Sequence, residues 1–152
     1  MPLVSHHLVT DRPIDAVFDV VTTARFWPQW HPATRGVEGD IDHPARLGDQ
    51  IIEHVTIAGI EGSGTWTVVV HDRPHRLVLQ ADLSVGRLRI SYHLVAVDGG
   101  ATRFQRDLEF PELGPQVSAA MDAQSAEGLV RLAGLVERET SPRLPATPSS
   151  AL

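Results

Sequence analysis

The sequence predicts an α+β domain in which a curved antiparallel sheet of about seven strands wraps around one long C-terminal helix, with two short helices after the first strand. Three observations support this prediction. A strand pattern followed at once by helical spacing opens the chain. Strand patterns separated by short turns occupy the middle, and beyond about residue 115 the apolar period becomes helical again.

The first strand is expected at residues 3–10. Pro13 then suits the first turn of a helix, in which apolar residues recur at helical spacing (Val17, Phe18 and Val21). Pro28 restricts further helical structure, so residues 23–30 are expected to form a second short helix that ends in a turn.

Five further strands are predicted at residues 50–58, 66–70, 76–83, 87–97 and 102–110. The Asp98-Gly99-Gly100 segment is a strong hairpin signal, and short turns at this regular spacing indicate an antiparallel meander. Gly62 and Gly64 are expected between two strands, where they permit a tight turn or a bend of the sheet.

The long helix is expected from about residue 115 to residue 140, so the domain covers residues 1–140. Residues 141–152 contain three prolines and several small residues, which predicts a disordered C-terminal tail. No other helix is long enough to cover the sheet. A twisted sheet bent around one helix leaves a gap where side chains are too small to meet, and this gap predicts an internal apolar cavity.

Composition narrows the classes of function. The 152 residues include no cysteine, which excludes disulfides, thiolate catalysis and cysteine-based zinc sites. A net charge of −6 argues against general nucleic-acid binding. No apolar run approaches the ~20 residues of a membrane span, and the N-terminus lacks a signal-peptide pattern, so a cytoplasmic protein without membrane insertion is expected.

The order of these elements resembles the START-like superfamily, also called SRPBCC or helix-grip proteins. The resemblance extends from Leu3 to about Glu139, and four local motifs carry it: PIDAVF at 13–18, WPQWHP at 27–32, LGD at 47–49, and WTV at 66–68 leading to DRPHRL at 72–77. The nearest subgroup is the bacterial polyketide cyclase/dehydrase and lipid-transport-like proteins. This resemblance implies a helix-grip fold, but the subgroup has varied functions, so an activity taken from it is analogy.

Alternation along each strand assigns the side chains that face the long helix. Three polar residues interrupt these otherwise apolar faces: Glu53, Tyr92 and Arg106. A buried charge is costly unless it is paired, so one interpretation is that the three residues orient a polar group of a ligand. The alternatives are a structural Glu53–Arg106 ion pair or a bulge that turns one side chain outward, and for Tyr92 a core aromatic.

Four further residues complete the predicted ligand-binding set. Trp66 is expected on the inward face, where it lines or fills the cavity. Trp30 is expected to line the cavity by resemblance to a tryptophan of the family, whereas Trp27 better suits a small satellite core. Met121 and Gln124 lie where the apolar stripe of the long helix is thin, although an exposed glutamine is the simpler interpretation.

The eight histidines do not form a recognisable metal motif, so neither a metal nor another cofactor is expected. His31 is the best single candidate for acid–base chemistry because it follows Trp30 near the expected cavity mouth, but a solvated loop histidine is the simpler interpretation. Glycine-rich phosphate loops and nucleophile elbows are not found.

These observations leave three functions open. The first is binding of a small hydrophobic molecule (a polyketide, a lipid or an isoprenoid) in the cavity. The second is a cyclase or dehydratase that folds a flexible chain there, with catalytic residues unassigned. The third is a protein-interaction module with a filled core. The sequence also leaves open whether the chain forms a homodimer.

Overall fold

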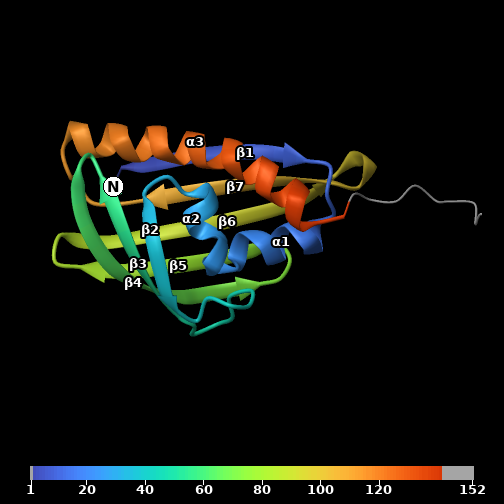
Figure 1. Cartoon of the computed structure of the whole chain (residues 1–152), viewed down its shortest axis with the longest axis horizontal. Coiled ribbons are helices and arrows are strands. Elements are labelled where there is room, and N and C mark those ends of the chain that lie inside the picture. The colour runs from blue at the N-terminus through green and yellow to red at the C-terminus, as the bar shows by residue number, and fades with distance from the viewer. Residues whose placement is uncertain (1, 142–152) are drawn as a thin grey trace, which may run out of the picture.

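The computed structural model describes residues 2–141 and confirms the predicted fold class: a seven-stranded antiparallel sheet curls around one long helix (Figure 1). In chain order the elements are β1 (Leu3–Thr10), α1 (Ile14–Thr22), a 3-10 turn (Ala24–Phe26), α2 (Trp27–Trp30), β2 (Thr34–Gly39), β3 (Gln50–Ile57), β4 (Ile60–Asp72), β5 (Arg76–Leu83), β6 (Gly86–Val97), a second 3-10 turn (Asp98–Gly100), β7 (Ala101–Glu109) and α3 (Pro115–Glu139). Of the predicted tail, residues 142–152 lie outside the described part of the chain.

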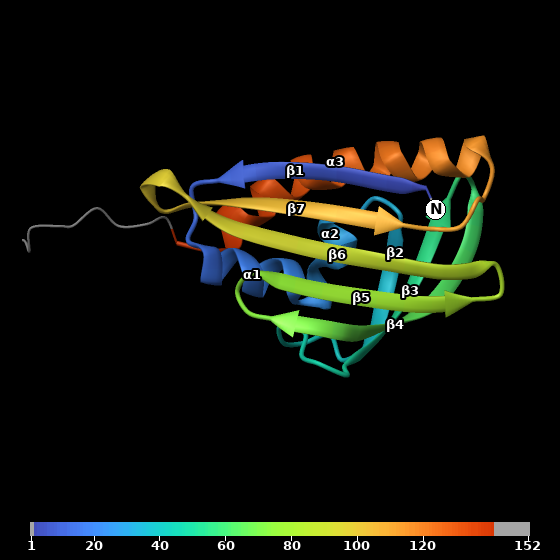
Figure 2. The same ribbon diagram turned by 180° about the vertical axis from the view of Figure 1, so that it is seen from behind.

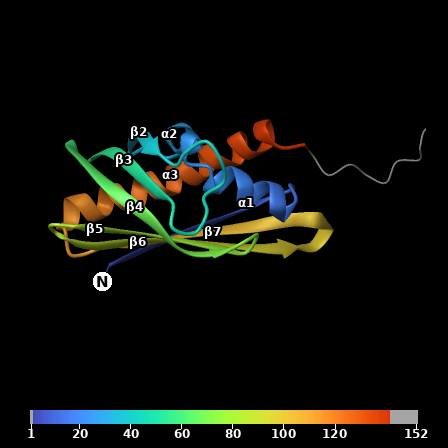
Figure 3. The same ribbon diagram turned by 90° about the horizontal axis from the view of Figure 1, so that it is seen from below.

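The strands are ordered β1-β7-β6-β5-β4-β3-β2, and every neighbouring pair is antiparallel. The first strand therefore pairs with the last, with Leu3 opposite Glu109 (Figure 2). All three helices lie on one face of the sheet, and β2 and β3 curl up beside them (Figure 3). This curvature gives the sheet a concave face that α3 covers.

The two halves of α3 contact the sheet differently. Its C-terminal half buries a dense apolar stripe at helical spacing (Leu129, Leu132, Leu135 and Val136). Its N-terminal half buries one large apolar side chain, Met121, and half-buries Val117. The helix is thus anchored at one end of the molecule and packed thinly over the sheet at the other.

Strand β2 is missing from the sequence prediction. Its residues, TRGVEG, show no apolar alternation and contain two glycines, so they give no strand signal. β2 is an edge strand that pairs only with β3, where such a pattern is tolerated. Thr34 is nevertheless buried at its start. The predicted helix at 23–30 is also divided, since a 3-10 turn precedes a four-residue helix.

The prediction was also wrong about the connection between β3 and β4. The turn consists of Ala58 and Gly59, both at positive φ, as a two-residue type I′ hairpin turn requires. Gly62 and Gly64 do not lie between strands but inside β4, which begins at Ile60. They lie opposite Val55 and Glu53 of β3.

A glycine also sets how closely α3 approaches α2. At Gly128 an added Cβ would lie 3.0 Å from the Trp30 carbonyl oxygen and 3.3 Å from Pro32 Cδ. At Gly134, six residues further along the same helix, the contact within 3.4 Å is the flexible end of Arg138. The two glycines lie in the same helix and differ in what an added methyl group would meet, so their alanine variants can be compared directly.

We expect Gly134→Ala to stabilise the protein by up to about 1 kcal/mol, because alanine has the higher helix propensity. Gly128→Ala should lose this gain or destabilise the protein, because the added methyl group forces α2 away from α3. Thermal unfolding measures both, with a shift of about 2–4 °C expected per kcal/mol. An equal rise in Tm for both variants would show that the contact at Gly128 is unimportant.

Candidate functional site

A cavity of about 180 Å³ lies between the concave face of the sheet and the N-terminal half of α3. The turns of β3–β4 and β5–β6 and the start of α3 lie at the same end of the molecule (Figure 1). The lining of the cavity is mostly apolar. It comprises His31, Ala33, Glu53, Val55, Ile57, Gly62, Ser63, Gly64, Trp66, Ala81, Leu83, Val85, Leu88, Ile90, Arg106, Leu108, Leu113, Val117 and Met121.

Two glycines of β4 contribute to the space in this cavity. Gly62 and Gly64 are on the same side of β4 as the buried Trp66, because strand residues alternate. An added Cβ at Gly64 would lie 3.0 Å from Leu83, and at Gly62 it would lie 3.9 Å from Val55. Side chains at these two positions would therefore extend into the cavity.

Glu53 is the acidic group of the cavity and is 5% exposed. Its carboxylate accepts a hydrogen bond from the Thr34 hydroxyl on β2 at 2.5 Å and another from Trp66 Nε1 on β4 at 3.0 Å. Both carboxylate oxygens therefore have a neutral donor. Because an ionised carboxylate offers about four acceptor sites, capacity remains for a further donor.

Arg106 of β7 is the basic group and is 3% exposed. Its Nη1 donates to Ser125 Oγ of α3 at 3.0 Å, and its Nη2 donates to His31 Nε2 at 2.6 Å. Nε is buried and has no hydrogen-bond partner among residues 2–141. Arg106 thus connects the sheet to α3 and to the segment after α2.

The direction of these hydrogen bonds fixes the protonation state of His31. Arginine can only donate, so His31 Nε2 must accept and the imidazole proton must lie on Nδ1. His31 Nδ1 lies 2.7 Å from Thr34 Oγ1. The Thr34 hydroxyl therefore accepts a hydrogen bond from His31 and donates one to Glu53. A one-way chain of donors runs from Arg106 through His31 and Thr34 to a Glu53 carboxylate.

The electrostatics of the site agree with this chain. Burial, and then the charge of Arg106, lower the pKa of His31 well below its ordinary 6.5, which keeps the imidazole neutral. Burial raises the pKa of Glu53, and hydrogen bonds from Thr34 and Trp66 together with the charge of Arg106 oppose that rise. Burial likewise raises the pKa of Tyr92 to about 12, so its hydroxyl stays protonated.

We call His31, Thr34, Glu53, Trp66, Arg106 and Ser125 the polar cluster. It separates the cavity from a packed aromatic region in which Trp30 contacts Tyr92 (6.4 Å between ring centres) and Tyr92 contacts Phe104 (5.2 Å). Trp30 and Tyr92 border His31, Glu53 and Arg106 from this side, where no water-sized space remains. The cavity therefore ends at the polar cluster.

The structure brings together four of the seven residues predicted to bind a ligand, because Glu53, Trp66, Arg106 and Met121 all line the cavity. Trp30 and Tyr92 lie behind the polar cluster. Gln124 is outside the lining and half-buried, and its side chain donates to the Thr56 carbonyl at 3.3 Å.

Sequence reasoning was wrong about the surroundings of His31 and missed two members of the polar cluster. His31 is not a solvated loop histidine, since its side chain is 14% exposed and bonded to Arg106 and Thr34. Thr34 and Ser125 gave no signal, because one lies on the unpredicted β2 and the other is a small polar residue on a helix. If a strand had been predicted at residues 34–39, Thr34 would have been considered as a residue of the sheet.

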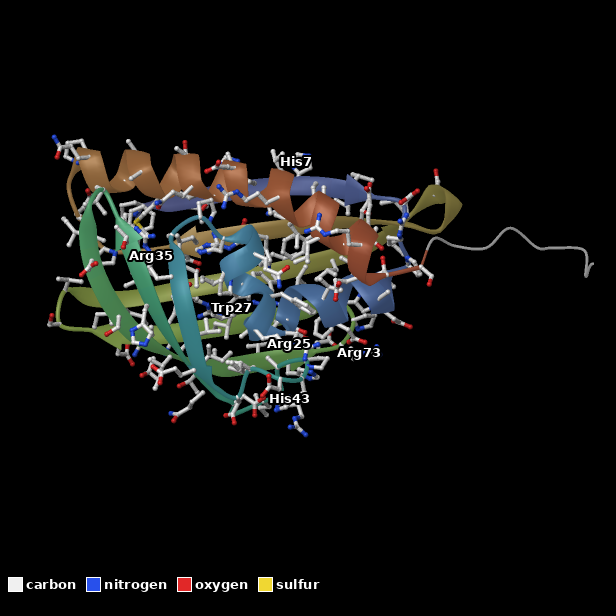
Figure 4. The ribbon with its side chains drawn as sticks, in the orientation of Figure 1. His7, Arg25, Trp27, Arg35, His43 and Arg73 are labelled. Atoms are coloured by element: carbon white, nitrogen blue, oxygen red, sulfur yellow. The ribbon has the colours of Figure 1, made fainter. Side chains whose placement is uncertain are left out.

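Two histidines next to members of the polar cluster have other partners: His6, opposite Arg106, contacts Asp122 of α3, and His54 contacts Glu38 of β2. Figure 4 places His7 on β1 and His43 in the loop between β2 and β3. Within residues 2–141, no three His, Asp or Glu side chains gather in an arrangement that could hold a metal ion. In the same part of the chain, none of the helices combines the length and the apolar character needed to cross a membrane.

The lowered pKa of His31 predicts how stability depends on pH. Below about pH 6.5 the unfolded chain protonates His31 and the folded protein does not, so stability falls as the pH drops toward the folded-state pKa. His31→Asn should remove this contribution. Urea unfolding of both proteins at about pH 5.5 and 7.5 measures it, with an effect of up to ~1.4 kcal/mol per pH unit.

Glu53 acts in the opposite direction, because its raised pKa favours the folded protein at acidic pH, so only the difference between wild type and variant is diagnostic. Identical pH dependences for the two proteins would contradict a neutral His31. Nitrogen chemical shifts of the imidazole provide an independent measurement of the proton on Nδ1.

Comparison with known proteins agrees with this architecture. The family model described as "Polyketide cyclase / dehydrase and lipid transport" matches residues 1–137. A curated relative, "Penitrem biosynthesis cluster 1 protein I" of Penicillium ochrochloron, is 31% identical over 108 residues, which cover 66% of this chain and 71% of the relative.

Among solved structures, a START superfamily protein from Mycobacterium smegmatis matches with a TM-score of 0.70 and 22% identity over 91% of this chain and 99% of that one. The Aha1 dimer from Colwellia psychrerythraea matches with a TM-score of 0.70 and 16% identity over 93% and 100%. These two likenesses concern the fold alone. The family model spans nearly the whole chain, and the chain therefore belongs to the polyketide cyclase / dehydrase and lipid transport family.

Proposed function

We propose that this protein binds a small, largely apolar molecule in the cavity. The observation that carries the proposal is the cavity itself, whose apolar walls end at a buried polar cluster. A pocket with few, well-placed polar groups is the usual form of a small-molecule site. The family description, which includes lipid transport, supports the same function.

The size of the cavity limits what it can hold. Its volume of about 180 Å³ is close to that of an engineered cavity of about 150 Å³ that binds benzene, and below the ~300–1,000 Å³ of drug-sized pockets. One ring with short substituents fits. A longer polyketide or lipid would place only one end in the cavity, with the rest leaving through the mouth.

The third function considered from the sequence, an interaction module, required a filled core. The two large side chains that could have filled it do not do so. Trp66 forms part of the cavity wall, and Phe104 packs against Tyr92 behind the polar cluster. Small-molecule binding is therefore the better-supported proposal.

Filling the cavity should weaken ligand binding without loss of stability. Gly62→Val places a side chain in the cavity at a position that has no positive φ, and valine favours strands. Calorimetric titration with acetophenone is expected to show at least a tenfold weaker affinity, with Tm unchanged or higher.

The control is Thr65→Val, which places valine on the opposite, exposed face of β4 and leaves the volume of the cavity unchanged. It should bind acetophenone like the wild type. Equal affinity of Gly62→Val and wild type would show that the ligand does not occupy this cavity. Native mass spectrometry of protein purified from cells would give the mass of a natural ligand.

A second candidate function is catalysis, and the chain of hydrogen bonds ending at Glu53 favours it. A carboxylate with a raised pKa can accept a proton from carbon next to a ketone, while the Arg106 guanidinium stabilises the enolate oxygen. The relative named for a biosynthesis cluster and the family's cyclase and dehydrase members support this candidate.

Catalysis predicts that the protein accelerates exchange of the methyl protons of acetophenone in deuterated water, followed by proton NMR. Glu53→Gln should remove the acceleration and keep acetophenone binding measurable by calorimetry. Glu61→Gln, an exposed substitution outside the cavity lining, should leave both unchanged. Exchange at the rate of buffer alone, with acetophenone bound, would exclude this chemistry.

A further inference from the structure

We propose that the cavity selects neutral ligands that carry both a hydroxyl group and a carbonyl oxygen, and that it disfavours carboxylates and amines. This inference rests on the proposed binding function and specifies its chemical class. It depends on the net charge of the polar cluster, on the hydrogen-bonding capacity that its members retain, and on the size of the cavity.

The charge of the polar cluster is zero. Arg106 is positive, the direction of the hydrogen-bond chain makes Glu53 an acceptor on both oxygens, and the same chain makes His31 neutral. The two buried charges therefore balance each other within an apolar region. A charged ligand would leave one charge without a counterpart, at a large cost in desolvation.

The retained hydrogen-bonding capacity is of two kinds. Glu53 has unused acceptor sites because Thr34 and Trp66 occupy two of about four. Arg106 has unused donors because its hydrogen bonds to His31 and Ser125 use two of its five N–H groups, the Tyr92 hydroxyl engages at most one more, and Nε has no partner among residues 2–141. Both residues line the cavity.

A ligand that matches this pattern donates to Glu53 and accepts from Arg106. A hydroxyl group supplies the donor and a carbonyl oxygen supplies the acceptor. The remaining surface of the ligand must be apolar, because the other lining residues are mostly aliphatic. With room for about one ring, the class is that of small hydroxylated ketones, or the hydroxyketone end of a longer molecule.

The test compares five probes of similar size by calorimetric titration at neutral pH with the unmodified protein. Ethylbenzene has neither polar group, acetophenone has the acceptor, 3-ethylphenol has the hydroxyl, and 3-hydroxyacetophenone has both. The fifth probe, 3-hydroxybenzoate, is the anionic relative. We expect 3-hydroxyacetophenone to bind at least tenfold more tightly than ethylbenzene and 3-hydroxybenzoate, with the two singly substituted probes between them.

The outcomes separate this inference from the proposed function. If ethylbenzene binds as tightly as 3-hydroxyacetophenone, or the anion binds most tightly, the cavity binds ligands but the inferred selectivity is wrong. If none of the five probes binds, the proposed function fails and the inference fails with it.

A pair of variants tests the role of Arg106. Arg106→Met should reduce the preference for 3-hydroxyacetophenone over 3-ethylphenol by at least fivefold. Arg103→Met, on the same strand with the opposite orientation, should retain it. Because Arg106→Met removes a buried charge and can unfold the protein, the side-chain N–H signals of Arg106 in the wild type supply a second measurement. They should shift with acetophenone and not with ethylbenzene, and equal shifts would overturn the role of Arg106.

Discussion

The cost of burying Glu53 and Arg106 is the constraint on which the arrangement of this molecule depends. A charge moved out of water must be paired or fully hydrogen-bonded. Here the partners come from four separate segments: Thr34 from β2, Trp66 from β4, Ser125 from α3 and His31 from the segment after α2. The polar cluster therefore fixes the relative positions of the sheet edge, the short helix and the long helix.

The fold and half of this cluster can be predicted from sequence patterns, for a physical reason. Alternation along β3 and β7 placed Glu53 and Arg106 on otherwise apolar faces, and a charge in such a position stands out. Thr34 does not stand out, and His31 was singled out only because it follows Trp30, with no indication of its partners. The two residues come after α2 and begin an edge strand, where no period exists to show which way a side chain points.

The cavity was predicted from a twisted sheet bent around one helix, with side chains too small to meet across the gap. The structure agrees on the helix side, where Met121 is the one large buried apolar residue of α3 near the cavity. The glycines at 62 and 64 contribute to the space as well. A glycine gives the same sequence signal in a turn and inside a strand, so only the register of β3 and β4 distinguishes the two.

The pairing of β1 with β7 has a consequence for how the chain acquires its structure. The first strand reaches its partner only across about a hundred residues of intervening chain, since Leu3 lies opposite Glu109. Contacts between such distant segments slow folding, because a large loop must close before they form. During synthesis on the ribosome, strands β2 to β6 can pair with their neighbours as they emerge, whereas β1 waits unpaired until β7 has been made. Completion of the sheet, with the helix that covers it, is then a late step that comes after release of nearly the entire domain.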